Sequence, residues 1–359
     1  MTNTELLPFR ALLPKPEVLQ QDPEVLAGCR ETFAELRATG VYQQLTEAAL
    51  YLLCFRQTDG VLRYAIGGLL DVMGYNRPNG TGIRPHEATL VKRMKKHRKR
   101  ILEFNGIIKP VLLTKPADEV LELAVLDLMA SMESPYLRYQ RWNGEVSLYT
   151  ITDPLRQADL LAALKLHEGP LAVADGHHRI ATTQGLAEEY GETFRWLPVM
   201  IMPAGCLGID TFIRSVKGSD LENVAISDYF QMGAPLTDPT LPNRSGEWLL
   251  GWRGQVYPLR GNPTDSTLDA VWFDQTVLPA LFGIRDSRTD ARLRSTEAVD
   301  GIDTLRALMD AYPDHYHFYG VPLSMTDFFG CISREELLPP KSTYFFPRVP
   351  TGLIVKTFE

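Results

Sequence analysis

Leu171-Ala172-Val173-Ala174-Asp175-Gly176-His177-His178-Arg179 is the stretch that decides the fold of this chain. Its four apolar residues predict a buried strand, and the Asp-Gly pair after them predicts a tight turn. The stretch from Ile180 to Tyr190 has the pattern of a helix, and Leu197 to Met202 has that of the next strand. The order of strand, turn, helix and strand favours an α+β (mixed α/β) core with its ligand at the carboxyl end of a strand.

The turn itself carries an arginine and two histidines where the helix is expected to start. A helix start has unpaired backbone N–H groups and the positive end of the helix dipole, so these side chains predict an anion site with phosphate as the favoured ligand. The alternative is that Asp175 is a turn residue and each histidine a satisfied structural one. Four chemically active side chains in five positions favour the functional interpretation, because burying them unpaired costs free energy.

A second polar group, Arg84-Pro85-His86-Glu87-Ala88-Thr89, precedes a basic run from Lys92 to Arg100. Apolar spacing predicts a helix from Glu87 to Phe104, on which long basic side chains are usually only solvated. Zinc-protease spacing is excluded because position 90 is Leu rather than His. A metal held jointly by His86, Glu87, His177 and His178 is left open.

A third segment, from Pro339 to Arg348, is followed by a predicted closing strand from Gly352 to Phe358. Lys341 lies beside two hydroxyl residues, which suits an acidic or phosphorylated ligand. The same stretch equally suits an edge strand flanked by prolines, with its polar side chains in water.

Composition limits the classes of protein to consider. The formal net charge of -7 over 359 residues argues against a general nucleic-acid binder or a protein of anionic membrane surfaces. The four cysteines are widely spaced without a CxxC pair, which predicts free thiols in a reducing compartment. The chain begins without a signal-peptide pattern, and no run of about eighteen apolar residues occurs. These features predict a cytoplasmic protein with no nucleic-acid and no membrane partner.

Other elements frame these motifs. The pattern predicts a helix from Asp22 to Gly40, a hairpin of strands at 49–55 and 61–66, a loop at 76–80, a strand at 110–113 and a helix from Asp153 to about Leu166. Beyond about residue 218 the chain is richer in Pro, Gly and Asp and less periodic. A chemical core at about 49–216 and a C-terminal extension at about 217–358 are therefore expected.

Four motifs, in order, resemble the family known as domain of unknown function 1015. They are Pro8-Phe9-Arg10-Ala11-Leu12, the segment 85–89 with Arg98, the segment 174–179, and Pro340-Lys341-Ser342-Thr343-Tyr344-Phe345-Phe346-Pro347. The resemblance covers nearly the whole chain and implies a single family-wide domain at 8–358. Where the family usually has Thr-His-Arg, this chain has Phe212-Ile213-Arg214, which keeps only the arginine.

The Asp-Gly-His-His-Arg turn also resembles the phosphate-binding turn of the fold shared by sulfiredoxin, the chromosome-partitioning CTPases and the free-serine kinases. This resemblance implies a ParB/sulfiredoxin-like core with large N- and C-terminal additions. Sulfiredoxin chemistry needs a cysteine in the turn, and this turn has none. The free-serine kinases have the same Asp-Gly-His-His-Arg sequence in this turn. The resemblance to them implies nucleotide-dependent phosphoryl transfer to a small hydroxyl compound.

The leading hypothesis is a small-molecule kinase that uses ATP or ADP, with Mg²⁺, and a free hydroxy amino acid such as L-serine as acceptor. Arg179 and the N–H groups after Gly176 would hold phosphate, with His177 and His178 as hydrogen-bond donors and Asp175 binding Mg²⁺ or orienting a histidine. Glu87 is the candidate base and His86 its positioning partner. The further anion contacts expected are Arg84, Arg98, Arg214 and Lys341.

Two hypotheses from other classes stand beside it. One is a nucleotide-binding regulator that hydrolyses slowly or not at all. The other is a metal-dependent hydrolase built on the histidine and carboxylate residues. The expected partners are a nucleotide and a small-molecule substrate. A homo-oligomer is compatible with each of the three hypotheses.

Overall fold

The computed structural model describes residues 5–57, 60–76, 82–141, 144–166, 168–218, 226–263 and 267–358. These residues form two compact units. Unit 1 comprises Met1–Gly208 and Pro347–Glu359, and unit 2 comprises Ile209–Phe346. Each unit has its own sheet, and all of the 84–90 and 175–179 segments belong to unit 1.

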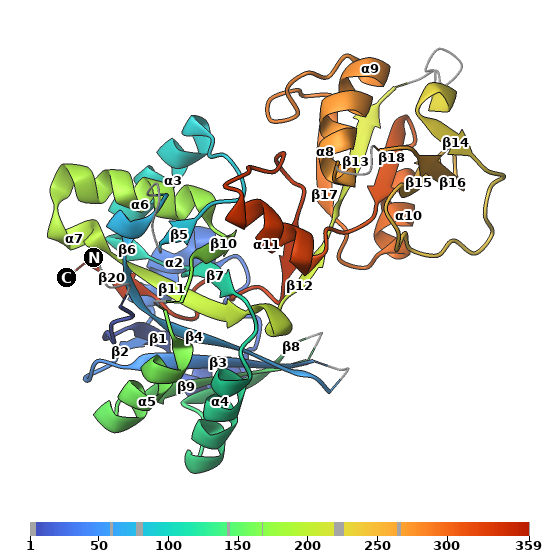
Figure 1. Ribbon diagram of the computed structural model, residues 1–359. Coiled ribbons are helices and arrows are strands. Elements are labelled where there is room, and N and C mark those ends of the chain that lie inside the picture. The colour runs from blue at the N-terminus through green and yellow to red at the C-terminus, as the bar shows by residue number, and fades with distance from the viewer. Residues whose placement is uncertain are drawn as a thin grey trace. The chain divides into compact units, whose positions relative to one another are not determined.

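The centre of unit 1 is an eight-stranded sheet (Figure 1). In spatial order its strands are β5 (Ile83–Arg84), β10 (Leu171–Asp175), β7 (Val111–Lys115), β11 (Trp196–Pro203), β4 (Leu62–Asp71), β3 (Leu50–Gln57), β9 (Gly144–Ile151) and β8 (Leu137–Arg141). Strand β10 runs parallel to β5 and antiparallel to β7, which in turn runs parallel to β11. The remaining pairs are antiparallel. The predicted α+β class is therefore confirmed.

Helices cover this sheet. They are α1 (Pro16–Gln21), α2 (Cys29–Ala38), α3 (Val91–Phe104), α4 (Glu119–Ser131), α5 (Pro154–Leu164), α6 (His177–Tyr190) and α7 (Glu192–Arg195). Helix α3 packs against α6, and α4 packs against α5. Figure 1 shows these two pairs on opposite sides of the sheet. Strand β10 is buried because its residues 171–174 are apolar and face both layers.

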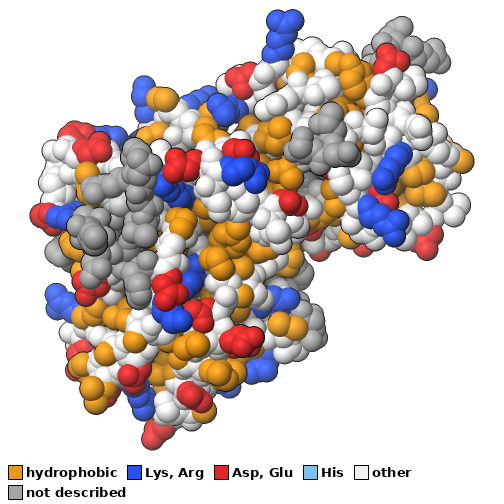
Figure 2. Space-filling view, viewed as in Figure 1, with side chains coloured by type: hydrophobic (Ala, Val, Ile, Leu, Met, Phe, Trp, Pro, Cys, Tyr) orange, Lys and Arg blue, Asp and Glu red, His pale blue; other side chains and the backbone are white. Residues whose placement is uncertain are grey.

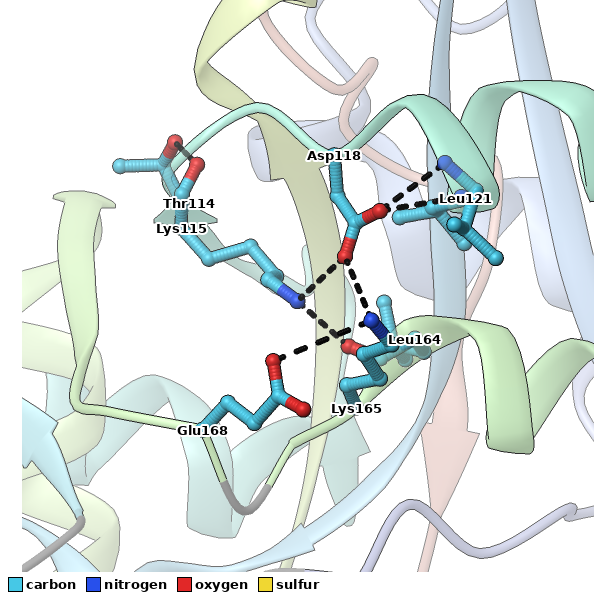
Figure 3. Close-up of polar contacts among 8 residues, drawn as sticks. Thr114, Lys115, Asp118, Leu121, Leu164, Lys165 and Glu168 are labelled. Atoms are coloured by element: carbon cyan, nitrogen blue, oxygen red, sulfur yellow. Dashed lines mark hydrogen bonds and ion pairs between the residues drawn. The ribbon is translucent and has the colours of Figure 1, made fainter.

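A buried lysine joins β7, α4 and α5 (Figure 3). The Lys115 ammonium donates to the carbonyl of Leu164, the last residue of α5, at 2.7 Å. The same ammonium lies 4.0 Å from Asp118, whose carboxylate caps α4 by accepting from the amides of Val120 and Leu121. A cation is favoured at a helix C-terminus and an anion at an N-terminus, so both contacts follow the helix dipoles.

Short strand pairs complete unit 1. Strand β1 (Leu12–Pro14) pairs with β2 (Tyr42–Gln44), and β6 (Gly106–Ile107) pairs with β20 (Lys356–Thr357). The second pair returns the end of the chain to unit 1, where the Gly352 amide donates to the Ile108 carbonyl at 2.7 Å. A further pair, β12 (Gly208–Asp210) and β19 (Tyr344–Phe346), stands where the chain enters and leaves unit 2.

Unit 2 is built on a six-stranded sheet. In spatial order its strands are β14 (Phe230–Met232), β16 (Gln255–Gly261), β15 (Glu247–Trp252), β18 (His315–Gly320), β13 (Phe212–Lys217) and β17 (Leu293–Glu297). Its helices are α8 (Asp269–Trp272), α9 (Leu278–Phe282), α10 (Ile302–Ala311) and α11 (Met325–Ser333). Alternate residues of β15 enter different cores, with Leu250 in an aromatic-rich cluster and Leu249 in a cluster beneath α10. This alternation is the period of two expected of a strand covered on both faces.

Several sequence-based expectations are confirmed and others are wrong. The β3–β4 hairpin and α5, α6 and β11 lie where they were predicted, whereas α3 begins at Val91 rather than Glu87 and the closing strand is only Lys356–Thr357. Most of the predicted 76–80 loop lies outside the described residues. The first compact unit ends its N-terminal part at Gly208. The expected core at about 49–216 and extension at about 217–358 stay predictions. Whether the chain nevertheless folds as one family-wide domain stays a prediction.

The described residues contain no helix with the length and apolar character needed to cross a membrane. On the visible face in Figure 2, acidic and basic side chains are interspersed in small groups. This distribution agrees with the modest net charge of -7.

Candidate functional site

The Asp-Gly-His-His-Arg turn joins the end of β10 to the start of α6. Gly176 has φ 113°, in the region that favours glycine, and α6 begins at His177. A Cβ on Gly176 would lie 2.8 Å from the Arg179 guanidinium, which packs over the turn. The backbone conformation therefore favours glycine here, and a Cβ would require the Arg179 guanidinium to move.

Asp175 is held between two cations. Its Oδ2 lies 2.9 Å from the Lys109 ammonium and 2.8 Å from the Arg179 guanidinium. Burial raises the pKa of Asp175, but the charges of Lys109, Arg179 and Arg348 outweigh burial and hold this pKa well below its usual value. Asp175 is therefore an ionised carboxylate, and its charge neutralises part of a strongly cationic surrounding.

Arg179 also ties the turn to the segment before β7. Its Nη1 donates to the carbonyls of Lys109 and Pro110, each at 2.7 Å. The side chain is only 12% exposed. Arg179 thus has a positioning role that the sequence did not predict, and any phosphate contact would use donors other than those already engaged.

Histidine rings join the two polar segments that the sequence singled out. The His86 amide donates to Nε2 of His177 at 3.4 Å, and the Leu90 amide donates to Nε2 of His178 at 3.0 Å. The rings of His86 and His177 meet edge to face, with centroids 4.3 Å apart. The segment 86–90 is therefore fastened across the start of α6.

These rings are neutral imidazoles. Burial lowers the pKa of His86 to about 4, although its hydrogen bond to the Val173 carbonyl opposes the shift. Burial lowers the pKa of His177 well below its usual value. Because Nε2 of His177 and of His178 accepts a backbone N–H, the ring proton of each sits on Nδ1. A hydrogen bond from either ring to a phosphate would come from Nδ1.

The other residues near the junction are Glu87 and Arg84. Glu87 directly follows His86 and is half-buried. Arg84 is buried in β5, where it pairs with Ala172 of β10. The fold therefore brings Arg84, His86 and Glu87 to the part of the sheet that carries the turn.

The remaining expected anion contacts are Arg98 of unit 1 and Arg214 and Lys341 of unit 2. Arg98 forms a two-pronged ion pair with Glu189, at 2.9 Å for each nitrogen, near the far end of α6. At 1.5 Å of rise per residue, Glu189 is roughly 18 Å from the start of that helix at His177, so the structure does not bring Arg98 to the turn. Arg214 and Lys341 belong to unit 2, where Arg214 pairs with Asp274 at 3.1 Å and the Lys341 ammonium lies 4.7 Å from the Phe212 ring.

The residues do not fit a metal centre built by the protein. Within the described parts of the chain, no three His, Cys, Asp or Glu side chains gather closely enough to hold a metal ion. The Nε2 atoms of His177 and His178 are occupied by amides, and the Asp175 carboxylate is paired with two cations. The joint metal site on His86, Glu87, His177 and His178, which the sequence left open, is therefore not formed by the described residues, and no chemical step is assigned to a metal.

Lys109 and His97 are residues that sequence reasoning missed. Lys109 precedes β7, whose register places Leu112 opposite Asp175. His97 stacks near His178, with ring centroids 6.3 Å apart. A lysine before an apolar strand and a histidine within a basic run carry no signal of their own, because their importance depends on sheet register and helix packing.

Solved structures with a distant likeness were found. SbnI with C-terminal truncation from Staphylococcus aureus has 13% sequence identity and a TM-score of 0.45, over 80% of this chain and 86% of that one. Free serine kinase in complex with AMP has 14% identity and a TM-score of 0.44, over 81% and 90%. A conserved hypothetical protein from Pyrococcus furiosus has 13% identity and a TM-score of 0.42, over 81% and 95%.

No curated protein matches the sequence. A family model matches residues 10–277, about three quarters of the chain, and includes both the 84–90 segment and the turn. The chain belongs to the family described as "Protein of unknown function (DUF1015)".

Proposed function

We propose that this protein is a nucleotide-dependent small-molecule kinase, with ATP or ADP as donor and a free hydroxy amino acid such as L-serine as acceptor. The observation that carries the proposal is the junction between segment 86–90 and the start of α6. Two amide-to-histidine hydrogen bonds hold the segment that carries Glu87, the candidate base, beside the start of α6. This contact supports a shared site for the base and the phosphate. Phosphoryl transfer needs this kind of positioning more than covalent chemistry.

Each group at the junction has a role that its environment supports. The first N–H groups of α6 point out of the helix start and suit phosphate oxygens. The Nδ1–H groups of His177 and His178 are neutral donors, so they can bind an anion without a proton being lost at neutral pH. Glu87 takes the proton from the acceptor hydroxyl, and His86 fixes the segment that carries it.

The cations around Asp175 support the same site. Lys109 and Arg179 flank that carboxylate, and Arg348 adds a further positive charge to its surroundings. A preorganised positive field stabilises the charge that spreads over a phosphoryl group during transfer. Mg²⁺ is proposed only as a companion of the nucleotide phosphates, which supply most of its ligands in such enzymes.

The test is direct detection of the product. Wild-type protein incubated with ATP, Mg²⁺ and L-serine is followed by ³¹P NMR for a phosphomonoester signal that grows as the nucleotide signal falls. Glu87→Gln should keep nucleotide affinity and lose turnover by about a hundredfold or more, as expected for loss of a general base. Glu103→Gln, an exposed change of the same chemistry on α3, is the matched control and should behave as wild type.

The outcomes separate the candidate functions. Nucleotide binding without transfer to any hydroxy amino acid would favour the nucleotide-binding regulator instead. Normal turnover in Glu87→Gln would remove Glu87 from the role of base.

A further inference from the structure

A small cavity in unit 1 has an unusual lining. It lies between the start of α2, the face of α3 and the segment around β6, with a volume of about 50 Å³. Four cations line it, namely Arg30, Arg100, Lys109 and Arg179, and among the described residues no Asp or Glu does. A water molecule needs about 10–15 Å³ by this measure, so the cavity suits a group of a few heavy atoms.

The charge around the cavity is not balanced. Two of its cations share the carboxylate of Asp175, and Arg100 pairs with Glu31 at 3.3 Å. Four cations against two carboxylates leave two formal positive charges. A phosphate group on an ester carries about -1.5 to -2 at pH 7, which matches this surplus.

Two further lining residues agree with an anionic occupant. Burial first, and then the charges of Arg179, Arg30 and Arg100, lower the pKa of His97 to about 4, so this lining ring adds no positive charge of its own. Thr351 brings a hydroxyl from the returning C-terminal segment, which the Gly352 amide fixes to the carbonyl of Ile108.

The cavity has a larger neighbour. A second hollow of about 380 Å³ shares Arg30 and Thr351 with it and is lined also by Glu24, Glu31 and Tyr139. That volume is within the range of small-molecule sites. Its lining combines an aromatic face with carboxylates, which suits a small polar body bearing hydroxyl or amino groups.

We propose that the small cavity binds the phosphate group of a small phosphomonoester, whose polar body occupies the larger hollow. Arg30 and Arg100 reach the phosphate from α2 and α3. Lys109 and Arg179 line the side of the cavity that faces Asp175. The site needs neither a nucleotide nor phosphoryl transfer, so it goes beyond the proposed kinase. Because Lys109 and Arg179 also hold Asp175, occupancy of the cavity redistributes positive charge at the catalytic turn.

Titration calorimetry in chloride buffer tests the site, with inorganic phosphate and glycerol 3-phosphate as separate probes. Wild type should bind glycerol 3-phosphate with one site per chain and bind inorganic phosphate more weakly. Arg30→Gln should weaken binding of the ester by about tenfold, the loss of roughly 1.4 kcal/mol expected for one charge-assisted hydrogen bond. Arg30 is exposed and makes no ion pair with another described residue, so its replacement should leave the fold intact.

Two controls sharpen the result. Arg93→Gln removes an exposed arginine from α3 without touching the cavity lining and should bind like wild type. Glu87→Gln removes the proposed base of the kinase but no residue of the cavity lining, so it should also bind the ester like wild type. Ester binding therefore tests the cavity separately from kinase turnover. Absence of binding by both probes, or equal affinity in Arg30→Gln and wild type, would overturn the site. Equal affinity of wild type for phosphate and ester would overturn the role of the larger hollow.

Discussion

Two features of the structure favour glycine at position 176. Its φ of 113° disfavours any side chain, and a Cβ would displace the Arg179 guanidinium 2.8 Å away. We expect Gly176→Ala to lower the free energy of unfolding by about 2–4 kcal/mol, from backbone strain plus the disturbed ion pair with Asp175.

Gly254→Ala is the matched control for this prediction. Gly254 also has a positive φ, of 75°, but its Cβ would meet open space. Gly254→Ala should lower the free energy of unfolding by only about 1–2 kcal/mol, because it introduces backbone strain without a side-chain clash. Urea unfolding of both variants measures the difference, and equal losses would show that contact with Arg179 contributes nothing.

His86 predicts a pH dependence. Its pKa is about 4 in the folded protein against 6.5 for an ordinary histidine, so between these values the unfolded chain binds a proton that the folded protein does not. The contribution to stability is complete above about pH 6.5 and falls as the pH is lowered towards 4, by roughly 3 kcal/mol in all.

His86→Asn keeps a donor near the position of Nδ1, which contacts the Val173 carbonyl at 2.7 Å. The variant should therefore lose less stability than wild type between pH 7 and pH 4.5, as measured by urea unfolding at each pH. A parallel pH dependence in the two proteins would contradict the lowered pKa.

The identities of the motif residues could be predicted from the sequence, but their contacts could not. Asp175, His177 and His178 stand out because polar residues rarely follow a buried strand without a purpose. Arg179 was expected to face a ligand, yet it donates to two carbonyls and a carboxylate. Those partners depend on the register of β7 beside β10, which local spacing does not contain.

At the level of elements, Lys115 links one strand to two helices (Figure 3). It is buried, and burial lowers its pKa, yet its ammonium bonds to the end of α5 and faces the carboxylate that caps α4. We expect Lys115→Met to lower the free energy of unfolding by about 2 kcal/mol, because a buried carbonyl loses a charged donor.

An exposed lysine provides the comparison. Lys99 forms a surface pair with Glu103 at 3.5 Å, one helical turn away. Lys99→Met should change stability by less than about 0.5 kcal/mol. Thermal unfolding of both variants checks this, and a loss in Lys115→Met as small as in Lys99→Met would contradict the structural role of Lys115.

Elements with a strong local signal were predicted, and elements defined by tertiary contacts were not. The hairpin of β3 and β4 has apolar runs on both sides of a turn, and α5 has an Asp-Pro start whose carboxylate caps the helix. By contrast, β5 and β6 have only two residues each and exist because a neighbouring strand pairs with them. The helix expected from Glu87 begins only at Val91. The Leu90 amide, which would make the first intrahelical bond of the longer helix, donates to the His178 ring instead.

At the scale of the whole molecule, unit 2 is a continuous segment with its own sheet and two hydrophobic clusters. We expect a fragment of residues 209–346 to fold alone and to unfold cooperatively on heating. Circular dichroism and the dispersion of amide signals in NMR test this. A fragment without cooperative unfolding would instead support the single family-wide domain expected from the sequence.

The sequence could not place this boundary because composition changes only gradually near residue 218. The end of the chain also returns to unit 1, and a discontinuous unit leaves no mark in local composition. The net charge, in contrast, follows directly from the sequence. Figure 2 shows the corresponding mixture of acidic and basic side chains on the visible face.

On the proposed function, the junction of segment 86–90 with the start of α6 binds a nucleotide. Histidine-ring ¹⁵N NMR during an ADP titration tests it most directly. Binding of ADP should shift the Nδ1 signals of His177 and His178 while Nε2 of each ring remains unprotonated. Saturating ADP that leaves both His177 and His178 unperturbed would contradict it.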